Sequence, residues 1–204
     1  MSVPRHALVL LAAGGSRRLG EPKQLLRVGA ESLVQRAARL GLHTAPADAV
    51  VVCGAHADAV WAELAGCPLR RVDCADWRGG MGRSLAVGLA ALAPDVHGAL
   101  VLLCDQPALD AGHLVALRDA WRTDPARAAA SAYAGVLGVP ALLPRAWFDV
   151  LLASDQDQGA RTLLRAHADR VHAVPAPPLA DDIDTPAQAR DLDQPSLGGN
   201  RPEE

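Results

Sequence analysis

The segment from Leu11 to Lys23 (LAAGGSRRLGEPK) combines glycines, a hydroxyl group and cations in a short stretch of chain. Glycines let backbone N–H groups turn inward and contact phosphate oxygens, because no Cβ blocks the approach. The cations of Arg18 and Lys23 match the negative charge of a triphosphate, and such groups contribute most where charge grows in a transition state. The segment therefore predicts a nucleoside triphosphate site in which Arg18 and Lys23 are catalytic. The residues expected to contact the nucleotide here are Leu11, Ala12, Ala13, Gly14, Gly15, Ser16, Arg18 and Lys23.

The glycine spacing differs from that of two better-known phosphate-binding loops. Gly15 and Gly20 have the spacing of a P-loop, but Glu21 stands where that loop requires lysine. The dinucleotide fingerprint G-x-G-x-x-G does not fit Gly14 and Gly15 followed by Gly20. A surface loop with incidental arginines is the remaining alternative, and the density of matched positions disfavours it. Ser16 has no neighbouring histidine and no G-x-S-x-G motif occurs, so a serine nucleophile is not expected.

A second position that suits chemistry follows the apolar run 98–104 (GALVLLC). Asp105 comes directly after this run, at the expected end of a buried strand. A carboxylate there is well placed for Mg²⁺, which takes one or two protein carboxylates together with substrate phosphates. A turn-forming aspartate before Pro107 is the alternative. We expect Asp105 to act catalytically by binding the metal and the nucleotide, because the apolar run predicts its location independently.

Two further carboxylates, Asp182 and Asp184, flank Ile183 near the C-terminus. Residues two apart lie on the same side of an extended chain. Carboxylates that converge on one point usually require a cation or a shared proton. Asp184 is predicted as the second Mg²⁺ ligand, and Asp182 is the alternative for this position. The competing interpretation is an acidic start to the next helix, where negative charge is stabilising.

Short apolar runs alternate with longer amphipathic stretches along the chain. Strands are expected at 6–12, 49–53, 69–73, 98–104, 140–143 and 171–174, with a further strand and turn within 127–138. Helices are expected at 32–42, 58–64, 84–92, 110–121, 145–152 and 160–167, and a last one from Thr185 and Pro186. This alternation predicts an α/β fold: a doubly wound, mostly parallel sheet in three layers, α/β/α. Ligands of such sheets bind beyond the carboxyl ends of the strands, where the turns after Leu11 and Leu103 both fall.

Composition narrows the possible partners. The chain has 204 residues, of which 50% are hydrophobic, and a formal net charge of -3. The length suits one domain over 1–194, followed by a polar tail, 195–204, that is expected to be disordered. The acidic balance argues against nucleic acid as a partner, and no apolar run is long enough to cross a membrane. The N-terminus lacks the features of a secretory signal, which favours a cytoplasmic location.

The motif L-A-A-G-G-S-R-R-L-G-E-P-K resembles the signature of the MobA-like nucleotidyltransferases, and most closely that of the molybdenum cofactor cytidylyltransferases. The loop of this family reads roughly L-A-[AG]-G-x-S-x-R-M-G-x-x-K, so this chain departs from it at Leu19. Guanylyl-type members tend to have glycine in place of Ala13, which makes CTP the favoured donor. The resemblance continues in G-G-M-G-R-S from Gly79, C-D-Q-P from Cys104 and D-I-D-T-P from Asp182.

The glycine-rich turn of the first of these segments implies nucleotide contacts from Gly80, Met81 and Ser84. Backbone amides and a hydroxyl at a helix start suit phosphate or ribose, and a simple helix start with Ser84 near the cap is the alternative.

The segment expected to bind the acceptor, roughly 127–170, matches the family less closely. Val139 stands where relatives usually have histidine in G-H-P-V, and Gln156 replaces the first glycine of G-D-x-G-A-R. Arg161 suits an anionic acceptor because its planar guanidinium pairs well with phosphate or carboxylate; a solvated helix residue is the alternative. The residues predicted to bind the acceptor are Gln106, Arg161 and Asp182.

The resemblance implies transfer of CMP from CTP to the phosphate of molybdopterin, with Mg²⁺ as cofactor and pyrophosphate as the released product. The acceptor phosphate attacks the α-phosphorus, so catalysis consists of positioning and charge neutralisation. A molybdenum hydroxylase is implied as a further partner. Three alternatives stay open: GTP as donor, another acceptor such as a sugar phosphate, or a non-catalytic carrier or insertion protein for the molybdenum cofactor.

Overall fold

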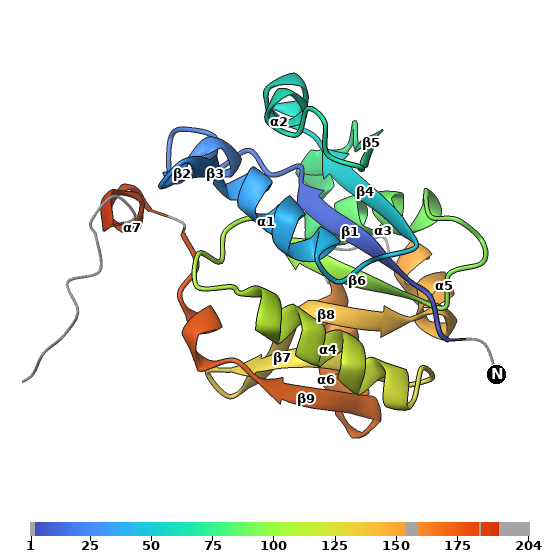
Figure 1. Cartoon of the computed structure of the whole chain (residues 1–204). Coiled ribbons are helices and arrows are strands. Elements are labelled where there is room, and N and C mark those ends of the chain that lie inside the picture. Colours follow the sequence, from blue (N-terminus) through green and yellow to red (C-terminus); the bar gives the residue numbers. More distant parts are fainter. Residues whose placement is uncertain (1–2, 154–158, 184, 192–204) are drawn as a thin grey trace, which may run out of the picture.

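The centre of the fold is a seven-stranded sheet with the order β5-β4-β1-β6-β8-β7-β9 (Figure 1). A computed structural model describes residues 3–153, 159–183 and 185–191. The strands are β1 (His6–Ala12), β4 (Asp48–Cys53), β5 (Arg70–Asp73), β6 (Gly98–Leu103), β7 (Ala128–Tyr133), β8 (Val136–Pro144) and β9 (Val171–Pro175). Only β8 among them runs antiparallel to its neighbours, β6 and β7; the other strand pairs are parallel. The predicted mostly parallel α/β sheet is confirmed.

Helices cover both faces of this sheet, which gives the three layers expected (Figure 1). The helices α1 (Leu33–Leu42), α2 (Ala57–Glu63) and α4 (Ala111–Thr123) share one hydrophobic core with the sheet. The helices α3 (Met81–Ala90), α5 (Phe148–Leu152) and α6 (Gly159–Ala166) share a second core on the opposite face. A small hairpin of β2 (Arg27–Val28) and β3 (Glu31–Ser32) precedes α1, and α7 (Pro186–Asp191) comes last.

Strand β1 lies in the middle of the sheet and is apolar along almost its whole length. All of its residues are buried, with Leu8 and Leu10 in the core of α1 and Ala7 and Val9 in the core of α3. A strand covered on both faces has no solvent side for polar residues. Gly88 brings α3 close to this strand, because a Cβ at position 88 would lie 2.7 Å from Cγ1 of Val9.

Polar side chains cap the starts of several helices. Ser32 forms a capping box with Gln35 at the start of α1, and Asp110 accepts a hydrogen bond of 2.8 Å from the amide of His113 in α4. The hydroxyl of Thr185 accepts a hydrogen bond from the amide of Gln188 in α7. These side chains satisfy amides that have no partner within the helix.

Two predicted boundaries were wrong. Helix α3 begins at Met81 rather than at Ser84, because Gly80 adopts a φ of 98° as its N-cap and places Ser84 inside the first turn. Apolar periodicity could not reveal this start, which lies among glycines. The strand predicted at 140–143 is part of the longer β8, which follows β7 through a turn at Ala134 and Gly135 and pairs antiparallel.

The path of the chain creates a crevice beside β1. From β1 the chain proceeds outward to β4 and β5, then returns to β6 on the other side of β1. Such a reversal leaves a ligand-binding crevice at the carboxyl ends of the two strands. Among the described residues, no helix combines the length and apolar character that a membrane span requires. The tail predicted at 195–204 lies outside the described residues.

Candidate active site

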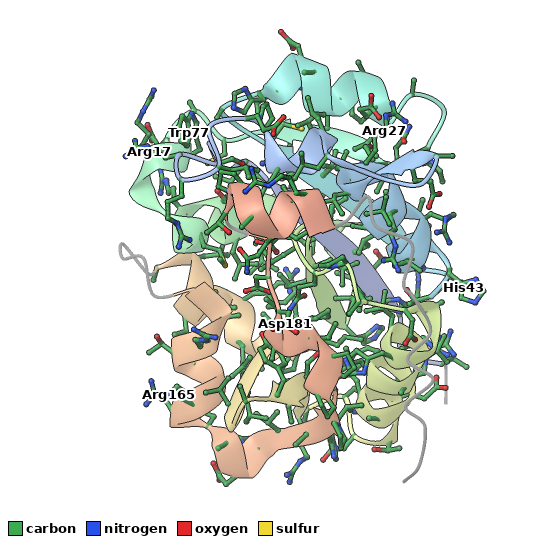
Figure 2. The ribbon with its side chains drawn as sticks, turned by 90° about the vertical axis from the view of Figure 1, so that its left-hand side faces the viewer. Arg17, Arg27, His43, Trp77, Arg165 and Asp181 are labelled. Atoms are coloured by element: carbon green, nitrogen blue, oxygen red, sulfur yellow. The ribbon has the colours of Figure 1, made fainter. Side chains whose placement is uncertain are left out.

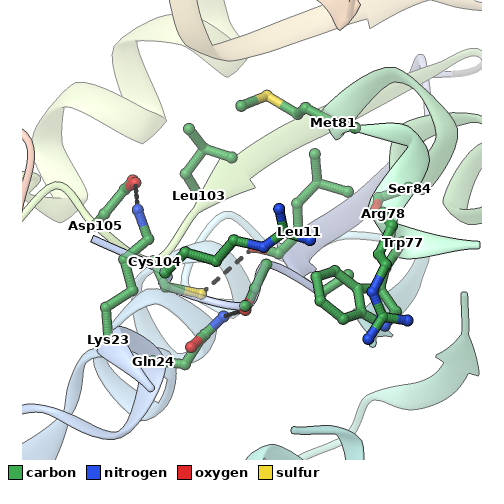
Figure 3. A pocket seen from close by; sticks show the side chains of 15 residues that line it. Leu11, Lys23, Gln24, Trp77, Arg78, Met81, Ser84, Leu103, Cys104 and Asp105 are labelled. Carbon is green, nitrogen blue, oxygen red and sulfur yellow. Dashed lines mark hydrogen bonds and ion pairs between the residues drawn. The ribbon is translucent and has the colours of Figure 1, made fainter. Parts of the chain in front are cut away.

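A cavity of about 310 Å³ opens at the carboxyl ends of β1 and β6, against the start of α3 (Figure 3). The residues predicted to bind nucleotide that line this cavity are Leu11, Ala13, Gly14, Gly15, Lys23, Gly80, Met81, Ser84 and Asp105. The structure thus brings together three segments that are far apart in the sequence. Of the other predicted residues, Ala12 is buried at the end of β1, and Ser16 and Arg18 belong to the same loop but do not line the cavity.

The loop after β1 is held in shape by Gln24, which sequence reasoning missed. Its amide Nε2 donates hydrogen bonds to the carbonyl oxygens of Ala12, at 3.1 Å, and Gly14, at 2.8 Å. The backbone amide of Lys23 donates to Oγ of Ser16 at 3.0 Å, which closes the loop. The signal available was a polar residue directly after Lys23 and before two leucines. Ser16 and Gln24 therefore shape the glycine-rich loop.

Lys23 and Asp105 meet at one end of the cavity. The ammonium group of Lys23 forms an ion pair with Oδ2 of Asp105, which links the loop after β1 to the end of β6 (Figure 3). The other carboxylate oxygen, Oδ1, is buried and accepts no hydrogen bond from any residue that the structure describes. Buried polar atoms are normally satisfied, so this oxygen is suited to a ligand that the protein chain itself does not provide.

The donor set at Asp105 fits a divalent cation that binds together with phosphate. Carboxylate oxygen is the ligand type that Mg²⁺ prefers. Within the described ranges, no three histidine, cysteine or acidic side chains gather to form a complete metal site. A cation at Asp105 would need further ligands, which phosphate oxygens, water or the predicted ligand Asp184 can supply. Asp184, the other predicted ligand, lies outside the described residues, but the amide of Ile183 donates to the carbonyl oxygen of Asp105 at 2.9 Å.

Two buried groups line the inner wall. The thiol of Cys104 donates to the carbonyl oxygen of Leu11 at 3.6 Å, and burial raises the pKa of this thiol, so that it stays protonated. The hydroxyl of Ser84 lies against Sγ of Cys74 at 3.9 Å. All four cysteines are free. A protonated, buried thiol is a packing group and not a nucleophile.

The opposite end of the cavity is formed by side chains that the sequence did not indicate. Trp77 and Arg78 line this end, across from Lys23 and Asp105 (Figure 3). Arg17 also lines the cavity, and Figure 2 shows it on the same side of the molecule as Trp77. The cationic lining of the cavity thus includes Arg17 and Arg78 in addition to Lys23.

A second cavity of about 270 Å³ adjoins the first, because Met81 and Leu103 line both. It brings together Tyr133 from β7, Arg161 from α6 and Asp182 from the C-terminal segment. Gln106 does not line it. Its Nε2 donates to the carbonyl oxygens of Val139, at 3.2 Å, and Leu179, at 3.4 Å. Gln106 therefore holds the wall of this cavity in place.

Tyr133 is the only tyrosine of the chain and was not predicted as a site residue. Its hydroxyl donates to the carbonyl oxygen of Val139 at 3.0 Å. Burial raises the pKa of this phenol, the charge of Asp182 raises it further, and Arg161 opposes the shift. Gly138 leaves room for the ring, because a Cβ there would lie 2.5 Å from the hydroxyl oxygen. A tyrosine in an alanine-rich strand was the available signal.

Comparison with known proteins gives one family. A family model described as the MobA-like NTP transferase domain matches residues 8–171. The chain is 38% identical to nicotine blue oxidoreductase of Paenarthrobacter nicotinovorans, over 86% of this chain and 85% of that protein. It is 30% identical to purine catabolism protein PucB of Bacillus subtilis, over 88% of this chain and 92% of that protein. A probable molybdenum cofactor guanylyltransferase of Synechococcus elongatus is 33% identical, over 57% of this chain and 56% of the relative.

Solved structures share this fold. Rv0371c of Mycobacterium tuberculosis H37Rv is 28% identical with a TM-score of 0.78, and the similarity covers 94% of this chain and 98% of that one. The same protein was also solved in complex with manganese. That structure is 26% identical with a TM-score of 0.76, and the similarity covers 92% of this chain and 97% of that one. The fold predicted from the sequence is the fold of these neighbours.

Proposed function

The chain belongs to the MobA-like NTP transferase family, and on that premise we propose that it moves a nucleotidyl group from a nucleoside triphosphate to an acceptor that carries a phosphate. The observation that carries this proposal is the junction of the two cavities at Met81 and Leu103. One cavity has the glycine-rich loop, Lys23 and Asp105, which suit a triphosphate and a divalent cation. The other has Arg161 and Asp182, which suit a polar acceptor with an anionic group.

In the proposed reaction, an oxygen of the acceptor phosphate attacks the α-phosphorus of the donor. A new P–O bond forms there, the bond from the α-phosphorus to the oxygen bridging to the β-phosphorus breaks, and pyrophosphate leaves with the bonding electrons. Lys23 and Arg18 neutralise the charge that develops on the phosphates, and loop amides between Ala13 and Ser16 orient the nucleotide. No protein nucleophile takes part, which agrees with the buried, protonated Cys104.

Mg²⁺ is the cofactor in this proposal, held by Asp105 and Asp184. The bound cation would supply charge neutralisation and orient the phosphates. The manganese complex of Rv0371c supports a divalent cation in a related protein. On the side of this chain, the support is Oδ1 of Asp105, which is buried without a hydrogen bond from the described residues, and the contact of Ile183 with the backbone of Asp105.

The donor and acceptor are proposed more narrowly from the sequence. Ala13 favours CTP, and the molybdopterin phosphate is the acceptor that the motifs imply. The relative named as a probable guanylyltransferase supports a molybdenum cofactor role and makes GTP the alternative donor. A cytoplasmic location and delivery of the product to a molybdenum hydroxylase belong to the same proposal.

An oxidoreductase is the second candidate, because the relative named nicotine blue oxidoreductase is 38% identical over 85% of its length. An oxidation–reduction reaction would then replace nucleotidyl transfer. The G-x-G-x-x-G fingerprint does not occur in the glycine-rich loop, which disfavours this candidate. The test is to add nicotine blue and NADH or NADPH to the purified protein and to measure the oxidation of the nicotinamide by absorbance.

The decisive experiment combines the purified protein with Mg²⁺, CTP or GTP, and molybdopterin released anaerobically from a molybdoenzyme. We expect pyrophosphate release that depends on the acceptor and is faster with CTP, and none in the Asp105→Asn variant. Faster release with GTP would overturn the donor assignment alone. Binding of molybdopterin without pyrophosphate release from either triphosphate would contradict nucleotidyl transfer and favour a carrier.

A further inference from the structure

Trp77 is held at the rim of the first cavity by the loops that follow β1 and β4. It begins a short 3-10 helix, Trp77–Gly79, that leads from β5 into α3. A Cβ at Gly15 would lie 2.9 Å from two atoms of the indole ring, and a Cβ at Gly54 would lie 2.8 Å from Cβ of Trp77. The absence of side chains at positions 15 and 54 allows this close packing, which fixes the ring beside the glycine-rich loop.

The ring is partly buried and still borders the cavity. The guanidinium carbon of Arg78 lies 4.4 Å from the centroid of this ring, over its face. Arg78 itself is exposed. Cation–π contacts at exposed sites are weak, so a flat ligand that buries more of the ring can replace the guanidinium group.

Trp77 and the Lys23–Asp105 ion pair lie at opposite ends of the same cavity (Figure 3). A nucleotide has the same polarity, with a flat aromatic base at one end and phosphates at the other. Placing phosphates near Lys23 and Asp105 directs the base toward the indole. Gly14 and Gly15 also line the cavity, and because they have no side chains they leave room for the sugar.

We propose that Trp77 is the surface on which the nucleobase of the donor stacks, with the guanidinium of Arg78 displaced from the ring when the nucleotide binds. This inference rests on the proposed function, because it assumes a nucleotide in this cavity. Stacking is tolerant of base identity, since every base has an aromatic face. Trp77 therefore contributes affinity for any nucleoside triphosphate that binds, and other groups choose between CTP and GTP.

The test compares nucleotides with inorganic tripolyphosphate, which has the charge of the donor but no base. Each is titrated with Mg²⁺ into the wild-type protein, Trp77→Phe and Trp77→Leu, and calorimetry gives the dissociation constants. We expect Trp77→Leu to weaken the binding of CTP and GTP by about 5-fold to 150-fold, the range to which stacking energies on aromatic side chains correspond. Tripolyphosphate should bind within about two-fold of the wild-type value, and Trp77→Phe should keep most of the nucleotide affinity.

Tryptophan fluorescence gives a second readout that does not depend on Trp77→Leu being well folded. CTP should quench the emission of the wild-type protein, tripolyphosphate should not, and the quenching should disappear in Trp77→Phe. Trp61 on α2 does not line the cavity among the described residues, so Trp61→Phe should retain the quenching. Unchanged nucleotide affinity in Trp77→Leu, or quenching that survives in Trp77→Phe, would overturn the inference alone. A wild-type protein that binds neither nucleotide nor tripolyphosphate would overturn the proposed function.

Discussion

The ammonium group of Lys23 and the carboxylate of Asp105 form an ion pair across the carboxyl edge of the sheet, between the loop after β1 and the end of β6. The two side chains are 19% and 12% exposed, so neither charge is fully solvated. In the proposed reaction, the triphosphate and the cation meet at this ion pair. In the nucleotide-bound state we expect this pair to loosen, with Lys23 turning to phosphate and Asp105 to the cation.

Replacement of Asp105 by asparagine should abolish most of the activity while preserving the fold. The amide has nearly the same shape but lacks the charge that holds a cation. We expect kcat/KM for nucleotidyl transfer to fall at least about 100-fold, the scale seen when one charge-stabilising group is lost. Steady-state kinetics over a range of Mg²⁺ concentrations check this. Activity that returns at high Mg²⁺ would fit a weakened metal site, and near-normal activity at low Mg²⁺ would exclude Asp105 as a ligand.

Gln24→Leu should loosen the glycine-rich loop after β1 and lower the free energy of unfolding of the protein. The variant leaves the carbonyl oxygens of Ala12 and Gly14 without the donor that now satisfies them. Loss of a partner for a buried polar atom costs about 1–3 kcal/mol of unfolding free energy. Urea unfolding measures this cost, and calorimetry should show weaker binding of CTP. A variant with unchanged stability and affinity would mean that the loop keeps its shape without Gln24.

Gly54→Ala should be destabilising, because its Cβ would lie 2.6 Å from the carbonyl oxygen of Ala13 and 2.8 Å from Cβ of Trp77. Overpacking of this kind costs about 1–3 kcal/mol. Gly79→Ala is the matched control, since its nearest contact would be an ordinary 3.6 Å from Cβ of Arg83. Thermal unfolding should separate the two variants. Equal stability would show that the loops around Trp77 can move apart at little cost.

Arg161→Met should weaken the binding of the acceptor and leave the binding of the nucleotide nearly unchanged. Arg161 lines only the second of the two adjoining cavities, together with Tyr133 and Asp182. We expect KM for the acceptor to rise about 10-fold, equivalent to the loss of one charged hydrogen bond. The dissociation constant for CTP, measured without acceptor, should stay within about two-fold. A weaker CTP complex would place Arg161 on the donor side instead.

The stability of the protein should fall as the pH is lowered from about 6.5 to about 4, in part because of His6. This side chain is 1% exposed and forms a hydrogen bond with the hydroxyl group of Thr44. Burial and, to a lesser degree, the positive charges of Arg122 and Arg118 lower the pKa of His6 from 6.5 to about 4. The unfolded chain therefore binds a proton in this window that the folded chain does not. The shift corresponds to up to about 3 kcal/mol. His6→Gln should flatten the pH dependence of urea unfolding between these values; an unchanged profile would contradict this assignment.

Much of the fold could be predicted from the sequence because β1, β4 and β6 are buried on both faces and must be apolar throughout. The direction of β8 could not, since the residues 140–143 are equally apolar in a parallel or an antiparallel strand. The loop after β1, the start of α3 and the end of β6 meet at the cavity, and each contains residues suited to chemistry. Their meeting could be predicted, because parallel strands end at the same edge of a sheet. Trp77, Tyr133 and Gln24 were missed because their roles come from neighbours that are distant in the sequence or from loop hydrogen bonds.

The central claim is that the cavity between β1 and β6 binds a nucleoside triphosphate together with a divalent cation. Calorimetric titration of CTP, GTP, ATP and UTP, with and without Mg²⁺, into the wild-type protein and Lys23→Met tests it most directly. We predict Mg²⁺-dependent binding that is tightest for CTP and is weakened at least about 10-fold in Lys23→Met, since a charged hydrogen bond is lost. Absence of binding by all four triphosphates, or binding that neither Mg²⁺ nor Lys23 affects, would contradict the account.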